Sequence, residues 1–81
     1  CNKAIFSMLL SHERGVLGRV LNCLSDKGAN ILTIMQNPPI GERASVVISA
    51  DITGLTEGID AIISALLSIG GVERAGLLDV E

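Results

Sequence analysis

The residues best suited to hold a ligand lie in one stretch, Ser11–Leu17, of sequence Ser-His-Glu-Arg-Gly-Val-Leu. An apolar run, Ala4–Leu10, precedes it and predicts a strand, and apolar residues recur after it at helical spacing. The unpaired N–H groups and positive dipole end of a first helical turn attract a carboxylate or phosphate. Gly15, at the predicted helix start, would let such a ligand approach the backbone. From these residues alone, the simpler interpretation is a glycine that only relieves a tight turn.

Three polar side chains are further candidates for ligand contacts: His12, Arg14 and Asn30. Histidine titrates near neutral pH, but catalysis would also need an orienting carboxylate and a substrate pocket. An exposed turn residue is therefore the simplest interpretation of His12, followed by a ligand contact. Arg14 is placed to help hold a carboxylate, although such arginines are commonly solvated. Asn30, at a predicted strand start, suits a local backbone bond and a ligand contact equally well.

The composition fits one small domain that buries part of its surface against another copy. The chain has 81 residues, 48% of them hydrophobic and nearly all aliphatic, with Phe6 as its one aromatic residue. So much aliphatic surface on a short chain predicts a homodimer. The net charge is −3 and the six Lys and Arg residues are scattered, so we expect no nucleic-acid contact. The pairs Glu42-Arg43 and Glu73-Arg74 are interpreted as ordinary surface charges.

The cysteines, the histidine and the apolar runs exclude several other classes. Cys1 and Cys23 make no disulfide framework, and with His12 they make no metal site. We interpret Cys23 as a buried structural thiol. No apolar run is long enough for a membrane span and no signal peptide is present, which indicates a cytoplasmic protein. The chain begins with Cys1 and not Met, so we expect residues 1–81 to be a single domain within a longer protein.

The hydrophobic patterns predict an α+β fold with the element order βαββαβ. Strands are expected at Ala4–Leu10, Asn30–Asn37, Arg43–Asp51 and Val72–Val80, and the first helix at Gly15–Lys27. A second helix is expected to start after Thr56 as N-cap, to carry an apolar stripe from Ile59 to Leu67, and to stop at Gly70-Gly71. This is the ferredoxin-like arrangement, a four-stranded antiparallel sheet with two helices on one face. Right-handed crossovers place the first and third strands in the centre, which predicts the strand order 4-1-3-2.

Three details of these elements carry further expectations. Ala4–Leu10 is apolar at nearly every position, as expected for a strand covered on both faces. Gly58 should weaken the second helix by about 1 kcal/mol relative to alanine. Gly76, inside the last strand, marks a bulge or the close approach of another backbone.

The residues together resemble an ACT domain over about residues 4–80. The resemblance depends on Gly15-Val16-Leu17 at the helix start, Gly28-Ala29-Asn30-Ile31 before the second strand, and Gly71-Val72 before the last. Residues 28–36, with the following Pro39-Ile40, resemble more specifically the C-terminal ACT module of the small bacterial PheB proteins, which are sometimes labelled chorismate-mutase-like. That resemblance implies a helical segment before residue 1.

The resemblance also implies a function and a set of binding residues. ACT domains resembling this one are regulatory modules that bind an amino acid between two domains and control an enzyme or transcription factor. For this chain, an aromatic amino acid is among the candidate ligands. By position, the backbone of Gly15, Val16 and Leu17 would meet the ligand carboxylate, and Asn30 would complete the pocket across the interface. His12 stands where the family usually has Asp or Asn for the ligand amino group. Arg14 replaces the usual proline.

Two other functions remain open: a dimerisation module without a ligand, and a chorismate-mutase-like enzyme. A mutase site needs several cationic donors that converge on a dianion, whereas the cations of this chain are spread along the sequence. A regulatory domain and a dimerisation module would have the same fold. Only ligand binding at His12, Gly15 and Asn30 would distinguish them. We therefore expect a regulatory domain of amino-acid metabolism, with no catalytic residues, cofactor or metal.

Overall fold

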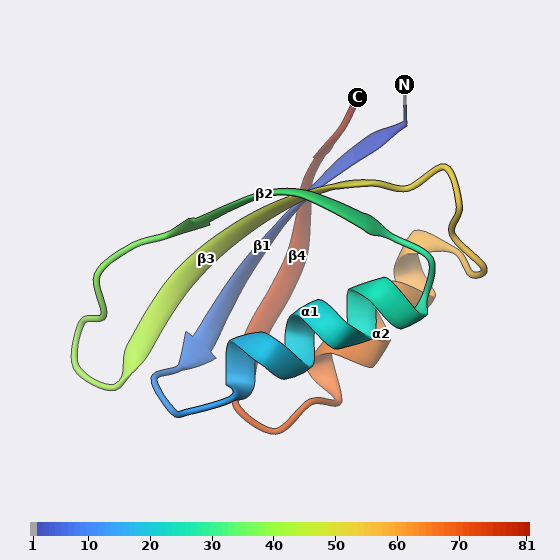
Figure 1. Cartoon of the computed structure of the whole chain (residues 1–81). Helices are drawn as coiled ribbons and strands as arrows, with labels where there is room; N and C mark the ends of the chain where they lie inside the picture. Colours follow the sequence, from blue (N-terminus) through green and yellow to red (C-terminus); the bar gives the residue numbers. More distant parts are fainter. Residues whose placement is uncertain (1) are drawn as a thin grey trace.

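Six elements follow one another in the order βαββαβ in the computed structural model, which describes residues 2–81 (Figure 1). Their bounds are β1 (Lys3–Ser11), α1 (Val16–Asp26), β2 (Asn30–Gln36), β3 (Arg43–Asp51), α2 (Ile59–Leu67) and β4 (Val72–Val80). The strands form one antiparallel sheet in the order β2-β3-β1-β4. The predicted fold class and strand order are confirmed. Cys1 and the expectations attached to it lie outside the described residues.

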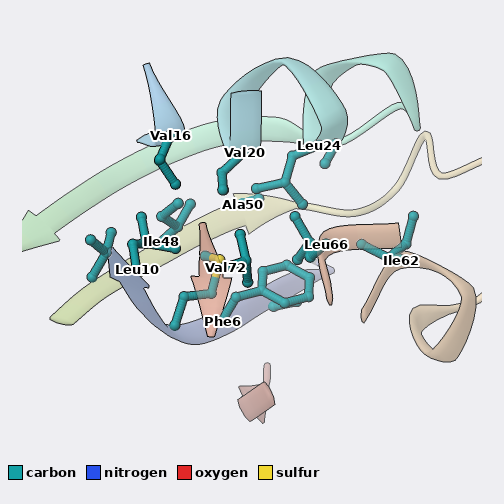
Figure 2. Close-up of a cluster of buried hydrophobic side chains, with 14 residues drawn as sticks. Phe6, Leu10, Val16, Val20, Leu24, Ile48, Ala50, Ile62, Leu66 and Val72 are labelled. Carbon is teal, nitrogen blue, oxygen red and sulfur yellow. The ribbon is translucent and has the colours of Figure 1, made fainter. Parts of the chain in front are cut away.

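The two helices pack on the same face of the sheet and enclose the core (Figure 1). Alternate residues of the two central strands point into it, and every fourth residue of α1 meets them from the other side. Figure 2 shows this cluster, in which the ring of Phe6 lies among aliphatic side chains from both helices and the sheet. Its fully buried members include Phe6, Val16, Val20, Leu24, Val46, Ile48, Ile62 and Leu66.

The second face of the sheet is not covered by any element of residues 2–81. Along β1, Ala4, Phe6, Met8 and Leu10 are buried, whereas the residues between them are only partly buried. The prediction that this strand is covered on both faces is therefore wrong for the single chain. The reason is topological, because two right-handed crossovers that start from neighbouring antiparallel strands place both helices on one side.

Glycines set both ends of α1. Gly15 precedes the helix with φ +87° and Gly28 follows its C-cap with φ +93°, a conformation that side chains rarely adopt. Gly28 N–H donates to the Ser25 carbonyl at 3.0 Å, and Ala29 N–H donates to the Leu24 carbonyl at 3.0 Å. The helix thus ends at Gly28, directly after its predicted last residue, Lys27.

The start of α2 differs from the prediction. Gly58, and not Thr56, is the N-cap, so the expected cost of a glycine inside the helix does not apply. Thr56 instead donates its backbone N–H and its hydroxyl to the Lys27 carbonyl at 3.0 and 3.2 Å. The Lys27 ammonium also pairs with Glu57 at 2.5 Å, and this hydrogen bond raises the pKa of Lys27. Thr56 thus bonds to the end of α1, through the Lys27 carbonyl, and does not cap α2.

Gly76 lies at neither irregularity of the last strand. It pairs directly with Ser7, while the register shifts fall opposite Ile5/Phe6 and Leu9/Leu10. A Cβ atom added to Gly76 would meet nothing within 4 Å. The predicted bulge at this residue is therefore wrong, and no atom of the described residues lies close to the space that a side chain at Gly76 would occupy. Within residues 2–81, no helix has the length and apolar character that crossing a membrane requires.

Candidate functional site

The turn between β1 and α1 is held at both sides by backbone hydrogen bonds. Ser11 N–H donates to the Gly71 carbonyl at 2.7 Å, and His12 N–H donates to the Glu42 carbonyl at 2.5 Å. The Ser11 hydroxyl donates to the Glu13 carboxylate at 3.1 Å. The turn is thus fixed against the β2–β3 loop and the start of β4, and it presents the first turn of α1 in one orientation.

The N-terminus of α1 has no side-chain cap among the described residues. Its first N–H groups, at Val16 and Leu17, are therefore available to a ligand, and the helix dipole makes this end positive. Gly15 leaves the approach open: the nearest atom to a Cβ placed there would be Nη1 of Arg19, at 3.6 Å. The helix start has the physical properties of an anion site.

Arg19 is a residue of this region that the sequence analysis did not single out. It lies one turn after Gly15, so its side chain reaches back over the helix start. Its Nη2 donates to the Gly70 carbonyl at 3.4 Å. The spacing of four residues from Gly15 is the signal that could have identified it.

Close packing at Gly71 determines the position of the helix start. A Cβ atom on Gly71 would lie 2.6 Å from Cγ2 of Val16 and 3.0 Å from Oγ of Ser11, and φ there is +99°. The side chain of Val16 is buried, so only its backbone faces the turn. Leu17 is partly buried against the core, whereas His12, Arg14 and Gly15 are exposed.

A hollow of about 250 Å³ begins at this turn and is rich in carboxylates. It is lined by Ser11, His12, Glu13, Glu42, Arg43 and Glu73. Arg43 neutralises one carboxylate through an ion pair between its Nε and Glu73 at 2.9 Å. Two of the residues interpreted as surface charges, Glu42 and Glu73, therefore face the same space as His12. The surplus of negative charge favours a cationic group, such as the ammonium of an amino acid.

Asn30 lies far from the other predicted site residues in the same chain. It pairs with Asp51, which pairs with Lys3, whereas Ser11 pairs with Arg43 at the opposite end of the sheet. The eight steps along β1 at about 3.3 Å each separate the two ends by about 26 Å. The structure thus brings His12, Arg14, Gly15, Val16 and Leu17 together and leaves Asn30 apart, so only a second copy could bring an Asn30 to this turn.

A second hollow, of about 370 Å³, lies between α1 and the connection from α2 to β4. Its lining consists of Arg19, Asn22, Cys23, Asp26, Lys27 and Ile69. Cys23 is a partly buried free thiol, and burial raises its pKa above the ordinary value. A raised pKa lowers the thiolate fraction and hence the reactivity, which agrees with the structural interpretation of this residue.

We expect Cys23 to be alkylated several times more slowly than an unstructured peptide thiol at pH 8. The Cys1→Ser variant isolates its signal, and mass spectrometry after timed exposure to iodoacetamide measures the rate. Urea should bring the rate up to that of the peptide, because unfolding removes the burial. A native rate above that of the peptide would contradict a structural role.

Known proteins similar to this chain include ACT domain-containing proteins of about twice its length. No family model matches the sequence. UPF0735 ACT domain-containing proteins of Lacticaseibacillus casei and Clostridium perfringens are 44% and 42% identical over 79 residues, or 98% of this chain and 55% and 54% of the relatives. The protein from Caldicellulosiruptor saccharolyticus is 36% identical over 75 residues, which cover 93% of this chain and 50% of the relative. The chain thus spans about half the length of these relatives.

Solved structures agree on the fold. The ACT domain from GTP pyrophosphokinase of Chlorobium tepidum superposes with a TM-score of 0.72 at 15% identity, covering 94% of this chain and 96% of that one. The regulatory subunit of aspartate kinase from Thermus thermophilus has a TM-score of 0.64 at 20% identity and covers 96% and 50%.

The fold, the sheet order and these relatives identify the chain as an ACT domain. The curated relatives are UPF0735 ACT domain-containing proteins and not specifically PheB proteins. The predicted ACT domain is therefore confirmed, and the finer resemblance to PheB proteins is not shown.

Proposed function

We propose that this ACT domain binds an amino acid at the start of α1 and thereby regulates amino-acid metabolism. The observation that supports the proposal is the uncapped helix start at Gly15, which lies beside the carboxylate-lined hollow. The N–H groups of Val16 and Leu17 would hold the ligand carboxylate, with Arg14 and Arg19 close by. The ligand ammonium would point toward His12 and the hollow. The role is regulatory, as is typical of ACT domains.

The proposed site is completed by a second copy of the chain. The exposed edge strand β2 carries the apolar residues Leu32, Ile34 and Met35, which favour burial in a homodimer. Antiparallel pairing of two β2 strands would bring Asn30 of one copy beside Gln36 of the other, toward the end of the sheet where α1 begins. The Asn30 amide could then donate to or accept from either end of an amino acid.

The length of the relatives supports a role within a longer protein. They are about twice as long as this chain. The domain would serve such a longer cytoplasmic protein, with a helical segment before residue 1 as in PheB proteins, and would pass ligand binding on to an enzyme or a transcription factor.

A thermal-shift screen of the twenty amino acids on the purified domain tests the proposal. A ligand at a hundred times its Kd should stabilise the fold by about 2.7 kcal/mol, or about 10–20 °C in Tm for a domain of this size. If no amino acid at millimolar concentration shifts the Tm, the sensor function fails and the dimerisation module without a ligand takes its place.

Two substitutions locate the site by calorimetry. Asn30→Ala should weaken binding by about 1–3 kcal/mol if its amide meets the ligand, whereas the matched Asn22→Ala, on the exposed side of α1, should leave the affinity unchanged. Gly15→Asn should abolish binding, because asparagine tolerates the positive φ and places a side chain over the helix start. Gly15→Val is unsuitable, since a β-branched residue at φ +87° would also strain the turn. Equal affinities for the Asn30 and Asn22 variants would exclude Asn30 from the site.

A further inference from the structure

The uncovered face of the sheet has an apolar centre, which is unusual for a face in contact with water. In an antiparallel sheet with one solvated face, the outward residues are normally polar. Here the register directs Ile5, Leu9, Val47 and Met35 to the side opposite the helices, and Met35 is 69% exposed. Small residues lie between them, and we call this whole surface the open face: Ile5, Ser7, Leu9, Thr33, Met35, Ser45, Val47, Ser49, Arg74, Gly76 and Asp79.

Charges of opposite sign flank this apolar centre along the strand direction. Asp51 and Asp79 lie toward the end of the sheet where Lys3 and Glu81 lie, and Arg74 lies toward the other end, where Arg43 is paired with Glu73 at 2.9 Å. Lys3, at the acidic end, is already paired with Glu81 at 3.2 Å. Hydrogen bonds from Thr53 lower the pKa of Asp51, which keeps that carboxylate charged. The open face is therefore acidic at one end and basic at the other.

We propose that the open face binds the open face of a second copy, with the strands of the two sheets running in opposite directions. A two-fold axis that lies between the sheets and perpendicular to the strands relates such copies. Each strand then lies opposite the same strand of the second copy and runs in the opposite direction. Positions at equal distances from Ser7, on either side of it along the register, therefore face each other across the contact. Ile5 meets Leu9 of the second copy, Asp79 meets Arg74, and Asp51 meets Arg43.

This arrangement is self-complementary in shape as well as in charge. Ser7, Val47 and Gly76 share the central register row and would each face the same residue of the second copy. The missing side chain of Gly76 leaves a shallow hollow of about 430 Å³, bordered by Ser7, Leu9 and Arg74, where another chain can approach. Facing sheets pack about 10 Å apart with their side chains interdigitated, so small residues in the central row suit a close contact.

The charge pattern selects this orientation over its alternative. A two-fold axis parallel to the strands would place acidic end on acidic end and basic on basic, which like-charge repulsion disfavours. The contact leaves α1 free, because both helices lie on the other face of the sheet, and β2 contributes Thr33 and Met35 to the open face while its backbone edge stays available for pairing. An edge-paired dimer that also uses its open face would form a tetramer.

Charge reversal tests the proposal by sedimentation velocity over a range of concentrations and salt. Arg74→Glu and Asp79→Arg should each weaken self-association about tenfold or more, because the symmetry places two such pairs in the contact. The double variant R74E/D79R should restore association, because the reversed charges attract again. The matched control Asp26→Arg, on the exposed side of α1, should leave the mass unchanged. The proposal would be overturned if the single variants form assemblies of the same mass as the wild type, or if the double variant stays dissociated.

Cross-linking provides a second test that does not depend on charge. In a background with Cys1→Ser and Cys23→Ser, Ser7→Cys lies at the centre of the contact, and a short bis-maleimide should join two chains in high yield. The same reagent should fail with Asp60→Cys on α2. Only single chains from the Ser7 variant would overturn the proposal, including the case in which another segment of a longer protein covers this face.

Discussion

Gly28→Ala should destabilise the domain by about 3–5 kcal/mol, the range reached when a packed site is forced apart. The Cβ atom would lie 2.1 Å from the Gly54 carbonyl oxygen and 3.0 Å from its carbon, so backbone must move. The φ of +93° adds about 1–2 kcal/mol for a residue other than glycine. A domain of 81 residues has only about 4–12 kcal/mol of stability, so urea midpoints should fall by a third or more.

Gly41→Ala is the matched control for this prediction. Gly41 also has a positive φ, +64°, but a Cβ atom there would meet nothing within 4 Å. Its replacement should cost only the conformational term of about 1–2 kcal/mol. The difference between the two variants isolates the contact of Gly28 with Gly54, which holds the end of α1 against the β3–α2 connection. Equal losses for both variants would show that the close contact contributes nothing.

Phe6→Ala should cost about 3–5 kcal/mol, because it removes a fully buried ring and leaves a cavity between the sheet and both helices (Figure 2). No other aromatic side chain is present in the chain to fill the space. Chemical denaturation, with the slope checked for two-state behaviour, measures the loss.

Ile40→Ala serves as the control for Phe6→Ala, since Ile40 is 86% exposed in the β2–β3 loop. Its replacement should change the stability by no more than about 0.5 kcal/mol. If Phe6→Ala cost no more than this surface change, the cluster around Phe6 would not be the core that stabilises the domain.

Local patterns predicted most of the fold. The strands β3 and β4 have the bounds expected from alternation and from the flanking glycines, and α1 lies within its predicted range. The errors occurred where distant segments compete with local ones. The sequence predicts Thr56 as a helix cap, but its hydroxyl donates a hydrogen bond to the Lys27 carbonyl, 29 residues away, instead. Burial on both faces of β1 was wrong because a strand's composition does not say which side the helices cover.

For the candidate site, the helix start could be predicted from the residues alone, because a strand, a glycine and an apolar helix in succession are local features. Its surroundings became known only from the folded chain. Strand register placed Glu42 and Glu73 beside His12 and put Asn30 about 26 Å away, at the far end of the sheet. Crossover handedness placed both helices on one face and left Ile5, Leu9 and Val47 on the other. Register and handedness arise from pairing between distant segments, which no local pattern of residues specifies.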